Sequence, residues 1–263
     1  MGSNAPYRWL QKRGLGPLGF PSKVTRRMLS AAELQLFRAQ GFVSIRSVLD
    51  DAQISLIRAA CDADVKVVAD DLRARGVDRE GRNQLDVCYL TSSPSIRRPE
   101  LRPVIWSASL VGICRGLFGD SAFLFADTFV VKLPSEQGEI GWHQEAALVP
   151  GLDDHDFFLV WIALDRMTET NGAMCMLSYE QAGTDTLRPL DRESACTYRG
   201  DERGTPMLLE AGDAVVFSST AYHRSGPNRS LGPRRAYVIG VSANPTGGAA
   251  ESGVFGPGNA ILQ

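Results

Sequence analysis

Histidine is scarce in this 263-residue chain, which holds three, so the position of each is informative. His143 lies in the run Gly-Trp-His-Gln-Glu, and Glu145 follows it by two residues. Side chains two residues apart on a β-strand point to the same face, so this pair could bind one metal ion. His223 follows a later β-rich run. Two histidines and one carboxylate form the ligand set that leaves three metal positions open, as in non-haem Fe(II) oxygenases.

The His-x-Glu pair alone is weak evidence, because such a triplet often arises by chance on a half-buried strand. Two adjacent arginines, Arg234 and Arg235, add to it, because they open a β-rich run soon after His223. Adjacent strand residues face opposite ways, so only one arginine can enter a barrel. A guanidinium there needs a planar anion, which a dicarboxylic cosubstrate can supply. The simpler interpretation is that these arginines are solvated charges beside a strand.

The elements that position these residues begin with a helical part. A capping box at Ser30 predicts a helix that ends at Gly41. Residues 42–49 are predicted to form a strand. Asp50 and Asp51 then precede a longer helix, in which residues 54–72 carry an amphipathic apolar stripe. A further helix is expected over residues 99–118.

From residue 122 onward, short β-rich runs separated by turn residues replace the helical pattern. They lie at 122–133, 141–148, 157–164, 172–177, 213–219 and 235–243. Many short strands without alternating helices favour an antiparallel sandwich or barrel. We therefore predict one mainly β domain over residues 30–245, buttressed by the N-terminal helices. An irregular arm (1–29) precedes it, and a Gly/Ala/Pro-rich tail (246–263), frayed or a mobile cover, follows.

Composition excludes several classes of protein. The formal charge of −2 provides no basic field for nucleic acid or an anionic membrane, and the longest apolar run (157–164) is too short to span a bilayer. Five cysteines without a CxxC pair indicate small buried side chains in a reducing compartment. We expect a cytoplasmic protein that binds a small molecule, and neither nucleic acid nor membrane. The oligomeric state is not encoded in a readable pattern.

Residues 32–245 resemble the phytanoyl-CoA dioxygenase-like branch of the Fe(II)/2-oxoglutarate-dependent oxygenases. The motifs are GFVSIRSVLDDAQISLIRAA, Lys132-Leu133-Pro134 before WHQE, the run 158–165, ETNGA at 169–173, and GDAVVFSSTAYHRSGPNRSLGPRRAY, the most specific of them. The resemblance implies a double-stranded β-helix, a jelly-roll of the cupin type, with helices on the major sheet. It also implies that His143, Glu145 and His223 bind Fe(II), with 2-oxoglutarate and O2 as cosubstrates.

The resemblance assigns cosubstrate residues one at a time. Arg234 matches the arginine that binds the distal carboxylate of 2-oxoglutarate, and Ser225 matches a hydroxyl residue that binds the same group. Trp161 matches an aromatic residue of the cosubstrate pocket. Thr128 and Lys132 lie close to positions that contact the cosubstrate in relatives. The simpler interpretations are that Trp161 is core and that Lys132 is a charge at a strand edge.

Two departures from the family pattern stand out. Glu145 replaces the usual Asp; since halogenating relatives have Ala or Gly there, a carboxylate argues against halogenation. Residues 177–181 read LSYEQ where relatives commonly read PGSH, which leaves the substrate class open. The third histidine, His155, lies among aspartates and is interpreted as part of a polar turn.

The function predicted from these residues is oxidation of a C–H bond of a small organic molecule, a specialised-metabolite intermediate. Hydroxylation with release of succinate and CO2 is the leading outcome. Desaturation, epimerisation or cyclisation by the same site stays open. A non-catalytic jelly-roll binding protein and a cupin-type metalloenzyme without 2-oxoglutarate are the alternatives, and the second leaves Arg234 and Ser225 unexplained.

Overall fold

The computed structural model describes residues 28–119, 121–148, 157–187, 200, 202–244 and the backbone of 259–262. The helices are α2 (Ala31–Gln40), α3 (Asp51–Arg75), α4 (Pro94–Arg97), α5 (Arg102–Ile105), α6 (Ala108–Phe118) and α7 (Tyr179–Ala182), with 3-10 helices η1 (Pro99–Leu101) and η2 (Glu145–Ala147). The strands are β1 (Phe42–Ile45), β2 (Arg79–Glu80), β3 (Asn83–Gln84), β4 (Cys88–Ser92), β5 (Ala122–Lys132), β6 (Ile140–His143), β7 (Phe157–Ala163), β8 (Met174–Met176), β9 (Thr205–Pro206), β10 (Ala214–Ser218), β11 (His223–Ser225), β12 (Arg234–Ser242) and β13 (Asn259–Leu262).

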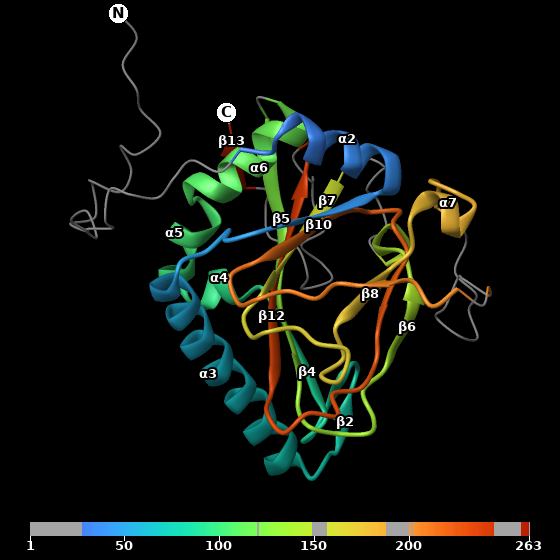
Figure 1. The fold of residues 1–263 in the computed structure, drawn as a ribbon. Coiled ribbons are helices and arrows are strands. Elements are labelled where there is room, and N and C mark those ends of the chain that lie inside the picture. The colour runs from blue at the N-terminus through green and yellow to red at the C-terminus, as the bar shows by residue number, and fades with distance from the viewer. Residues whose placement is uncertain are drawn as a thin grey trace, which may run out of the picture.

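Two antiparallel sheets carry the strands (Figure 1). The larger has nine strands in the order β1-β10-β7-β12-β5-β4-β3-β2, with β13 also paired to β5. The smaller has four, in the order β6-β11-β8-β9. In Figure 1, α3 and α5 lie on one side of the larger sheet, and β6 and β8 lie on the other. The predicted mainly β architecture with flanking helices is confirmed.

Strand β7 shows why both faces of the larger sheet are buried. Val160 and Ile162 belong to an apolar core that includes Ile57 of α3. The alternate residues Leu159 and Trp161 face the other way and belong to a second core that includes residues of β8 in the smaller sheet. Because strand side chains alternate, β7 serves both cores with one continuous apolar run.

The first two helices follow their capping residues. The Glu33 N–H donates to Ser30 Oγ at 3.2 Å and the Ser30 N–H donates to Glu33 Oε2 at 2.8 Å, so the predicted capping box is confirmed. Gly41 ends α2 with a φ of 87°, a left-handed conformation that glycine adopts without strain. Asp50 caps α3, which begins and ends close to its predicted limits.

The helix expected over residues 99–118 is wrong as one element. The segment divides into η1, α5 and α6, because Ser107 has extended backbone and caps α6 by accepting from the Leu110 N–H at 3.4 Å. Among the described residues, no single helix is long and apolar enough to cross a membrane. The pair Pro99–Ile105 and Ala108–Phe118, bent by 53°, meets the criteria of length and composition only when its two parts are combined.

Several strand limits also differ from the prediction. Strand β1 ends at Ile45, because Ser47 has a φ of 53° and its N–H donates to Asp213 Oδ1 at 2.9 Å. The backbone of 259–262 forms β13, in which Asn259 pairs with Leu124 of β5, so this part of the tail is neither frayed nor a mobile cover. Residues 1–27 and 246–258, assigned to the arm and the tail, lie outside the described residues.

The cysteines follow the prediction in part. Cys61 and Cys114 are buried, as expected of small apolar side chains. Cys88 and Cys175 are half-buried, and all four are free thiols. Cys196 lies outside the described residues.

Candidate metal centre and cosubstrate pocket

The two metal-site histidines meet because their strands pair. His143 is the last residue of β6, His223 is the first of β11, and the two are cross-strand partners. Their ring centres lie 4.0 Å apart. Glu145 Oε1 lies 3.3 Å from His223 Nε2 and 3.8 Å from His143 Nε2. One ligand atom from each residue lies within 4.8 Å of the others, so this cluster could hold one metal ion.

Glu145 reaches the histidines by a different route from the one predicted. The strand expected over 141–148 ends at His143, and Glu145 opens the 3-10 helix η2. Strand alternation therefore does not align the pair. Gln144 between them is fully buried and donates from Nε2 to the carbonyls of Thr186 (2.9 Å) and Thr220 (2.7 Å). These hydrogen bonds fix the turn that brings the carboxylate to the histidines.

Backbone carbonyls orient both imidazole rings. His143 Nδ1 lies 2.8 Å from the Gly141 carbonyl oxygen, and His223 Nδ1 lies 3.2 Å from that of Ala221. A carbonyl only accepts, so each Nδ1 carries the hydrogen and each Nε2 presents its lone pair. Such second partners fix the tautomer and the orientation of metal-binding histidines.

The surroundings of the cluster favour a neutral His223 and an ionised Glu145. Burial, and then the neighbouring His143, lower the pKa of His223. Burial alone would raise the pKa of Glu145, but the adjacent His143 and His223 outweigh it and hold that pKa well below its ordinary value. Neutral imidazoles and a carboxylate are the forms that bind a metal ion.

Arg234 is a buried cation that forms no ion pair with the described residues. Arg234 is 1% exposed. Its guanidinium carbon lies 5.6 Å from the centre of the ring of Trp161, a residue of the core between the sheets. Among the described residues, neither Nε nor Nη2 has a hydrogen-bond partner. A buried charge left unpaired is costly, and two guanidinium N–H groups match the two oxygens of a carboxylate. The guanidinium of Arg234, beside Trp161, is therefore suited to bind an anion.

Arg235 faces the opposite side of the sheet, as the strand pattern predicts. Its Nη2 lies 2.8 Å from Asp165 Oδ1, and its Nη1 donates to Asp62 of α3 at 2.8 and 2.9 Å. Its side chain is only 15% exposed. The interpretation of both arginines as solvated charges is therefore wrong, because Arg235 joins the sheet to α3 through two carboxylates.

Lys132 is also buried, at 1% exposed, and is the cross-strand partner of Arg234. Its Nζ donates to Ser225 Oγ at 2.7 Å and to the carbonyls of Ser225 and Gly226 at 2.9 and 2.6 Å. Burial, and then the positive charge of Arg234, lower the pKa of Lys132 to about 6. Lys132 is thus no strand-edge charge. Thr128, half-buried, lies four residues earlier on the same face of β5.

Asn228 is a site residue to which sequence reasoning gave no role, although it stands in the HRSGPN motif. It is fully buried, and its Nδ2 donates to the carbonyls of Lys132 (2.9 Å) and Gly232 (2.8 Å). Its Oδ1 accepts from the Ser230 N–H at 3.0 Å. Asn228 therefore ties the end of β5 to the loop that leads into β12 and Arg234. An asparagine that follows Gly-Pro and precedes a predicted strand is the sequence signal that could have identified it.

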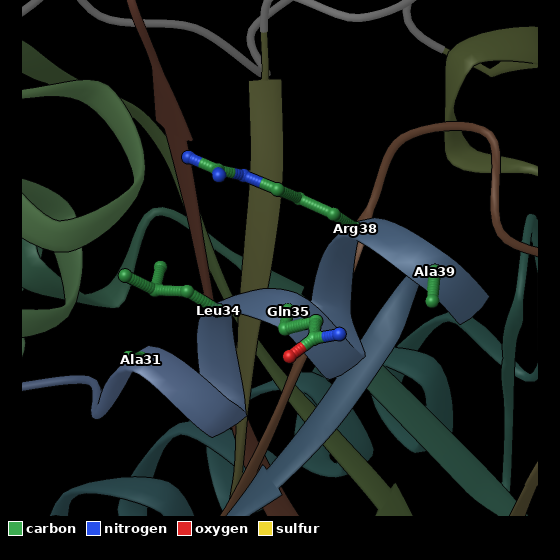
Figure 2. Close-up of a pocket in the computed structure, with 5 residues that line it drawn as sticks. All are labelled: Ala31, Leu34, Gln35, Arg38 and Ala39. Carbon is green, nitrogen blue, oxygen red and sulfur yellow. The ribbon is translucent and has the colours of Figure 1, made fainter.

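A surface hollow lies on α2, away from this cluster. Figure 2 shows the five residues that line it, Ala31, Leu34, Gln35, Arg38 and Ala39, all from this one helix. None of the predicted site residues lines the hollow. His155, assigned to a polar turn, lies outside the described residues.

The model of the phytanoyl-CoA dioxygenase family matches residues 37–236. This chain belongs to the phytanoyl-CoA dioxygenase family. The resemblance predicted from the sequence is thereby confirmed, and the family is one of Fe(II)/2-oxoglutarate-dependent oxygenases.

Curated relatives of this family member include two enzymes that are named after phosphorus compounds. A methylphosphonate hydroxylase of Gimesia maris is 28% identical over 155 residues, which are 57% of this chain and 57% of the relative. The "probable alpha-ketoglutarate-dependent hypophosphite dioxygenase" of Stutzerimonas stutzeri is 24% identical over 186 residues, 67% of this chain and 64% of the relative. The chain thus spans less than two thirds of either relative.

Solved structures share the fold of this family member. The non-haem α-ketoglutarate-dependent carbocyclase SnoK, from nogalamycin biosynthesis, has a TM-score of 0.69 at 22% identity, covering 92% of this chain and 96% of its own. The epimerase SnoN, in complex with Fe3+, α-ketoglutarate and a nogalamycin compound, has a TM-score of 0.58 at 18% identity, covering 83% and 87%. The predicted jelly-roll fold is confirmed.

Proposed function

We propose that this chain is an Fe(II)/2-oxoglutarate-dependent oxygenase that hydroxylates a C–H bond of a small organic molecule. The observation that carries the proposal is the buried guanidinium of Arg234, whose Nε and Nη2 have no hydrogen-bond partner among the described residues. Arg234 lies beside Trp161 of the core between the two sheets, while His143, Glu145 and His223 come together on the smaller sheet and the turn after β6. A metal ligand set alone fits many metalloenzymes, whereas a buried arginine with free N–H groups in the same fold also fits a cosubstrate whose far end is an anion.

The residues present fit both groups. Two neutral imidazoles and a carboxylate suit Fe(II) and leave coordination positions for other ligands. Arg234 would bind the distal carboxylate of 2-oxoglutarate through Nε and Nη2, and Ser225 would hydrogen-bond the same group. Trp161 would line the pocket beside the guanidinium. Thr128 is assigned to the same pocket because it shares a face of β5 with Lys132.

When bound, iron with 2-oxoglutarate and O2 supplies the oxidant that removes hydrogen from a C–H bond, with succinate and CO2 as coproducts. The chain's own residues bind, orient and exclude water. The histidine Nδ1–H groups hold the rings in place, and the apolar residues of the core between the sheets keep bulk water out. No side-chain nucleophile is needed, and the retained Glu145 argues against halogenation.

The outcome at the substrate depends on how the substrate lies. The solved structures of similar fold include a carbocyclase and an epimerase, so desaturation, epimerisation and cyclisation remain alternatives that the same residues would serve. We place the substrate among compact specialised-metabolite intermediates, in line with the nogalamycin enzymes. The phosphorus-compound relatives favour a second candidate, a small phosphonate. A non-catalytic binding protein would have no use for the intact ligand set.

We also place the protein in the cytoplasm. Cys61, Cys88, Cys114 and Cys175 are free thiols, which suits a reducing compartment. Burial raises the pKa of Cys61 and of Cys114, so both remain protonated and unreactive.

The test of the function is spectroscopic and then enzymatic. Anaerobic protein with Fe(II) and 2-oxoglutarate should show a weak visible charge-transfer band, which His223→Ala should lose. His155→Ala is the matched control, because the same substitution at the histidine assigned to a turn should keep the band. Succinate release should then rise with the true substrate in a panel that includes methylphosphonate. A wild-type protein without the band at saturating 2-oxoglutarate would contradict the proposal.

A further inference from the structure

We propose that Lys132 is a positioning residue that acts through Ser225, turning the Ser225 hydroxyl hydrogen toward the distal carboxylate of 2-oxoglutarate when that carboxylate binds. The inference rests on the proposed function, because it concerns how that cosubstrate is held. It assigns Lys132 no direct contact with the cosubstrate, in contrast to the role expected from the sequence.

A charged Lys132 has as many hydrogen-bond acceptors around it as it has hydrogens to donate. An ammonium group has three N–H donors and no acceptor. The Lys132 Nζ has three acceptors around it, Ser225 Oγ at 2.7 Å and the carbonyls of Ser225 and Gly226 at 2.9 and 2.6 Å. A charged Lys132 therefore uses all its donors on β11 and the loop after it. No N–H is left for a cosubstrate.

The Ser225 hydroxyl does not use its own hydrogen in the contact with a charged Lys132. A hydroxyl has one donor and two lone pairs, and it cannot donate to an ammonium group. Among the described residues, Ser225 Oγ forms a hydrogen bond with Lys132 alone. Ser225 is 7% exposed, so its hydrogen has little access to water. With Lys132 charged, that hydrogen is available for an anion.

Titratable groups on β12, on β4 and in the loop before β6 act on Lys132. Arg234 of β12 lies directly opposite it, Cys88 of β4 lies opposite on the other side, and Glu139 acts on it from the loop before β6. Two buried cations side by side are unfavourable without an anion, so the amine without cosubstrate is mainly neutral near pH 7 and accepts the Ser225 hydrogen. A bound carboxylate adds negative charge and favours the ammonium form. The Ser225 hydrogen is then released to the carboxylate.

This sequence has a measurable consequence, the uptake of a proton when 2-oxoglutarate binds. Between the pKa of Lys132 in the free protein, about 6, and its higher pKa in the complex, binding takes a proton from solution. At pH 7.5, calorimetric titration of the anaerobic Fe(II) protein with 2-oxoglutarate in two buffers of different ionisation enthalpy should detect a substantial fraction of one proton. Lys132→Met should abolish this uptake.

A double-mutant cycle separates action through Ser225 from direct contact. Lys132→Met and Ser225→Ala should each weaken 2-oxoglutarate binding about tenfold or more, since a hydrogen bond to a charged group is lost. The double variant should bind about as weakly as the worse single variant, because both changes remove one coupled interaction. Lys66→Met is the matched control: Lys66 is exposed and pairs with Asp70 on the same helix, so binding should be unchanged.

Each outcome has a distinct meaning. Equal loss from Lys132→Met in the presence and absence of the Ser225 hydroxyl would overturn the inference, because it means an independent contact. Absence of proton uptake by the wild-type protein would also overturn it, and this measurement needs no variant to fold. A wild-type protein that fails to bind 2-oxoglutarate at all would instead contradict the proposed function.

Discussion

Glu145 shows how one side chain compensates for its local backbone. Strand β6 ends two residues before it, so the carboxylate starts from a 3-10 turn rather than from a strand beside His143. Its Oε1 still lies 3.3 Å from His223 Nε2. Aspartate, the usual family residue, is one methylene shorter and would start from the same turn. The longer side chain therefore allows the carboxylate to reach the two histidines of the candidate metal site.

The adjacent arginines provide the sharpest residue-scale prediction. Arg234→Ala should raise the apparent KM for 2-oxoglutarate about 30-fold or more, since losing a charge-assisted contact in a desolvated pocket costs about 2–5 kcal/mol. Lysine at position 234 should rescue only part of this loss, because an ammonium cannot reproduce the planar two-point contact. The measurement is the dependence of succinate release on the 2-oxoglutarate concentration.

Arg235→Ala is the matched control for Arg234→Ala. Its guanidinium bonds Asp165 and Asp62 rather than the pocket, so the KM should change little. The free energy of unfolding should fall instead, by about 1–3 kcal/mol, because two carboxylates lose a charged donor. If Arg235→Ala were the variant with the raised KM, the assignment of the anion pocket to Arg234 would be wrong.

At the scale of elements, the sequence predicted helices with strong local signals well. The capping boxes at Ser30 and Asp50 each fix a helix start through bonds within four residues, so local sequence was sufficient. Strand β11 was not predicted, because three residues carry too little pattern. This segment is a strand because it pairs with β6 and β8, which lie far away in the sequence.

The candidate site also combines features that local sequence predicts with features that depend on distant contacts. The three candidate metal ligands were picked out by residue type and family resemblance, although Glu145 reaches the histidines from a 3-10 turn, whereas strand alternation correctly predicted that Arg234 and Arg235 face opposite ways. The contact of Lys132 with Ser225 depends instead on how the end of β5 meets β11, a contact between residues 93 positions apart. The early end of β6 depends on the buried hydrogen bonds of Gln144, whose acceptors lie on distant segments. No local pattern encodes such contacts.

Gly172 gives a prediction about how two loops meet. It has a φ of 75°, and a Cβ there would lie 2.5 Å from the Gly226 carbonyl oxygen, a backbone atom. That carbonyl also accepts from Lys132. Gly172→Ala should displace the loop, raise the KM for 2-oxoglutarate several-fold and lower the free energy of unfolding by more than the roughly 1–2 kcal/mol of a left-handed alanine. Succinate kinetics and denaturant unfolding measure both effects.

Gly183→Ala isolates the cost of the backbone conformation. Gly183 has a similar φ of 65°, but nothing lies within 4 Å of a Cβ added there. This variant should show only the left-handed penalty, with the KM unchanged. Equal stability losses and equal KM values in the two variants would mean that the close approach of Gly172 to Gly226 has no role in the site.

At the scale of the whole molecule, the two sheets contribute different halves of the site. The smaller sheet and the turn after it carry His143, Glu145 and His223, while the larger sheet carries Trp161 and Arg234. A cosubstrate that binds the metal at one end and Arg234 at the other therefore joins the sheets. Its binding should stabilise the fold as a whole and should depend on the metal.

Thermal unfolding tests this arrangement. Saturating Mn(II), which replaces Fe(II) without turnover, should raise the Tm, and 2-oxoglutarate should raise it further only when the metal is present. A ligand at 100 times its Kd stabilises a protein by about 2.7 kcal/mol, which corresponds to roughly 5–10 °C for a domain of this size. Arg234→Ala should keep the increment from the metal and lose most of that from 2-oxoglutarate. His223→Ala should lose both, because the cosubstrate depends on the metal. A 2-oxoglutarate increment that survives in Arg234→Ala would mean that the distal carboxylate is bound elsewhere and that the sheets are joined by other residues.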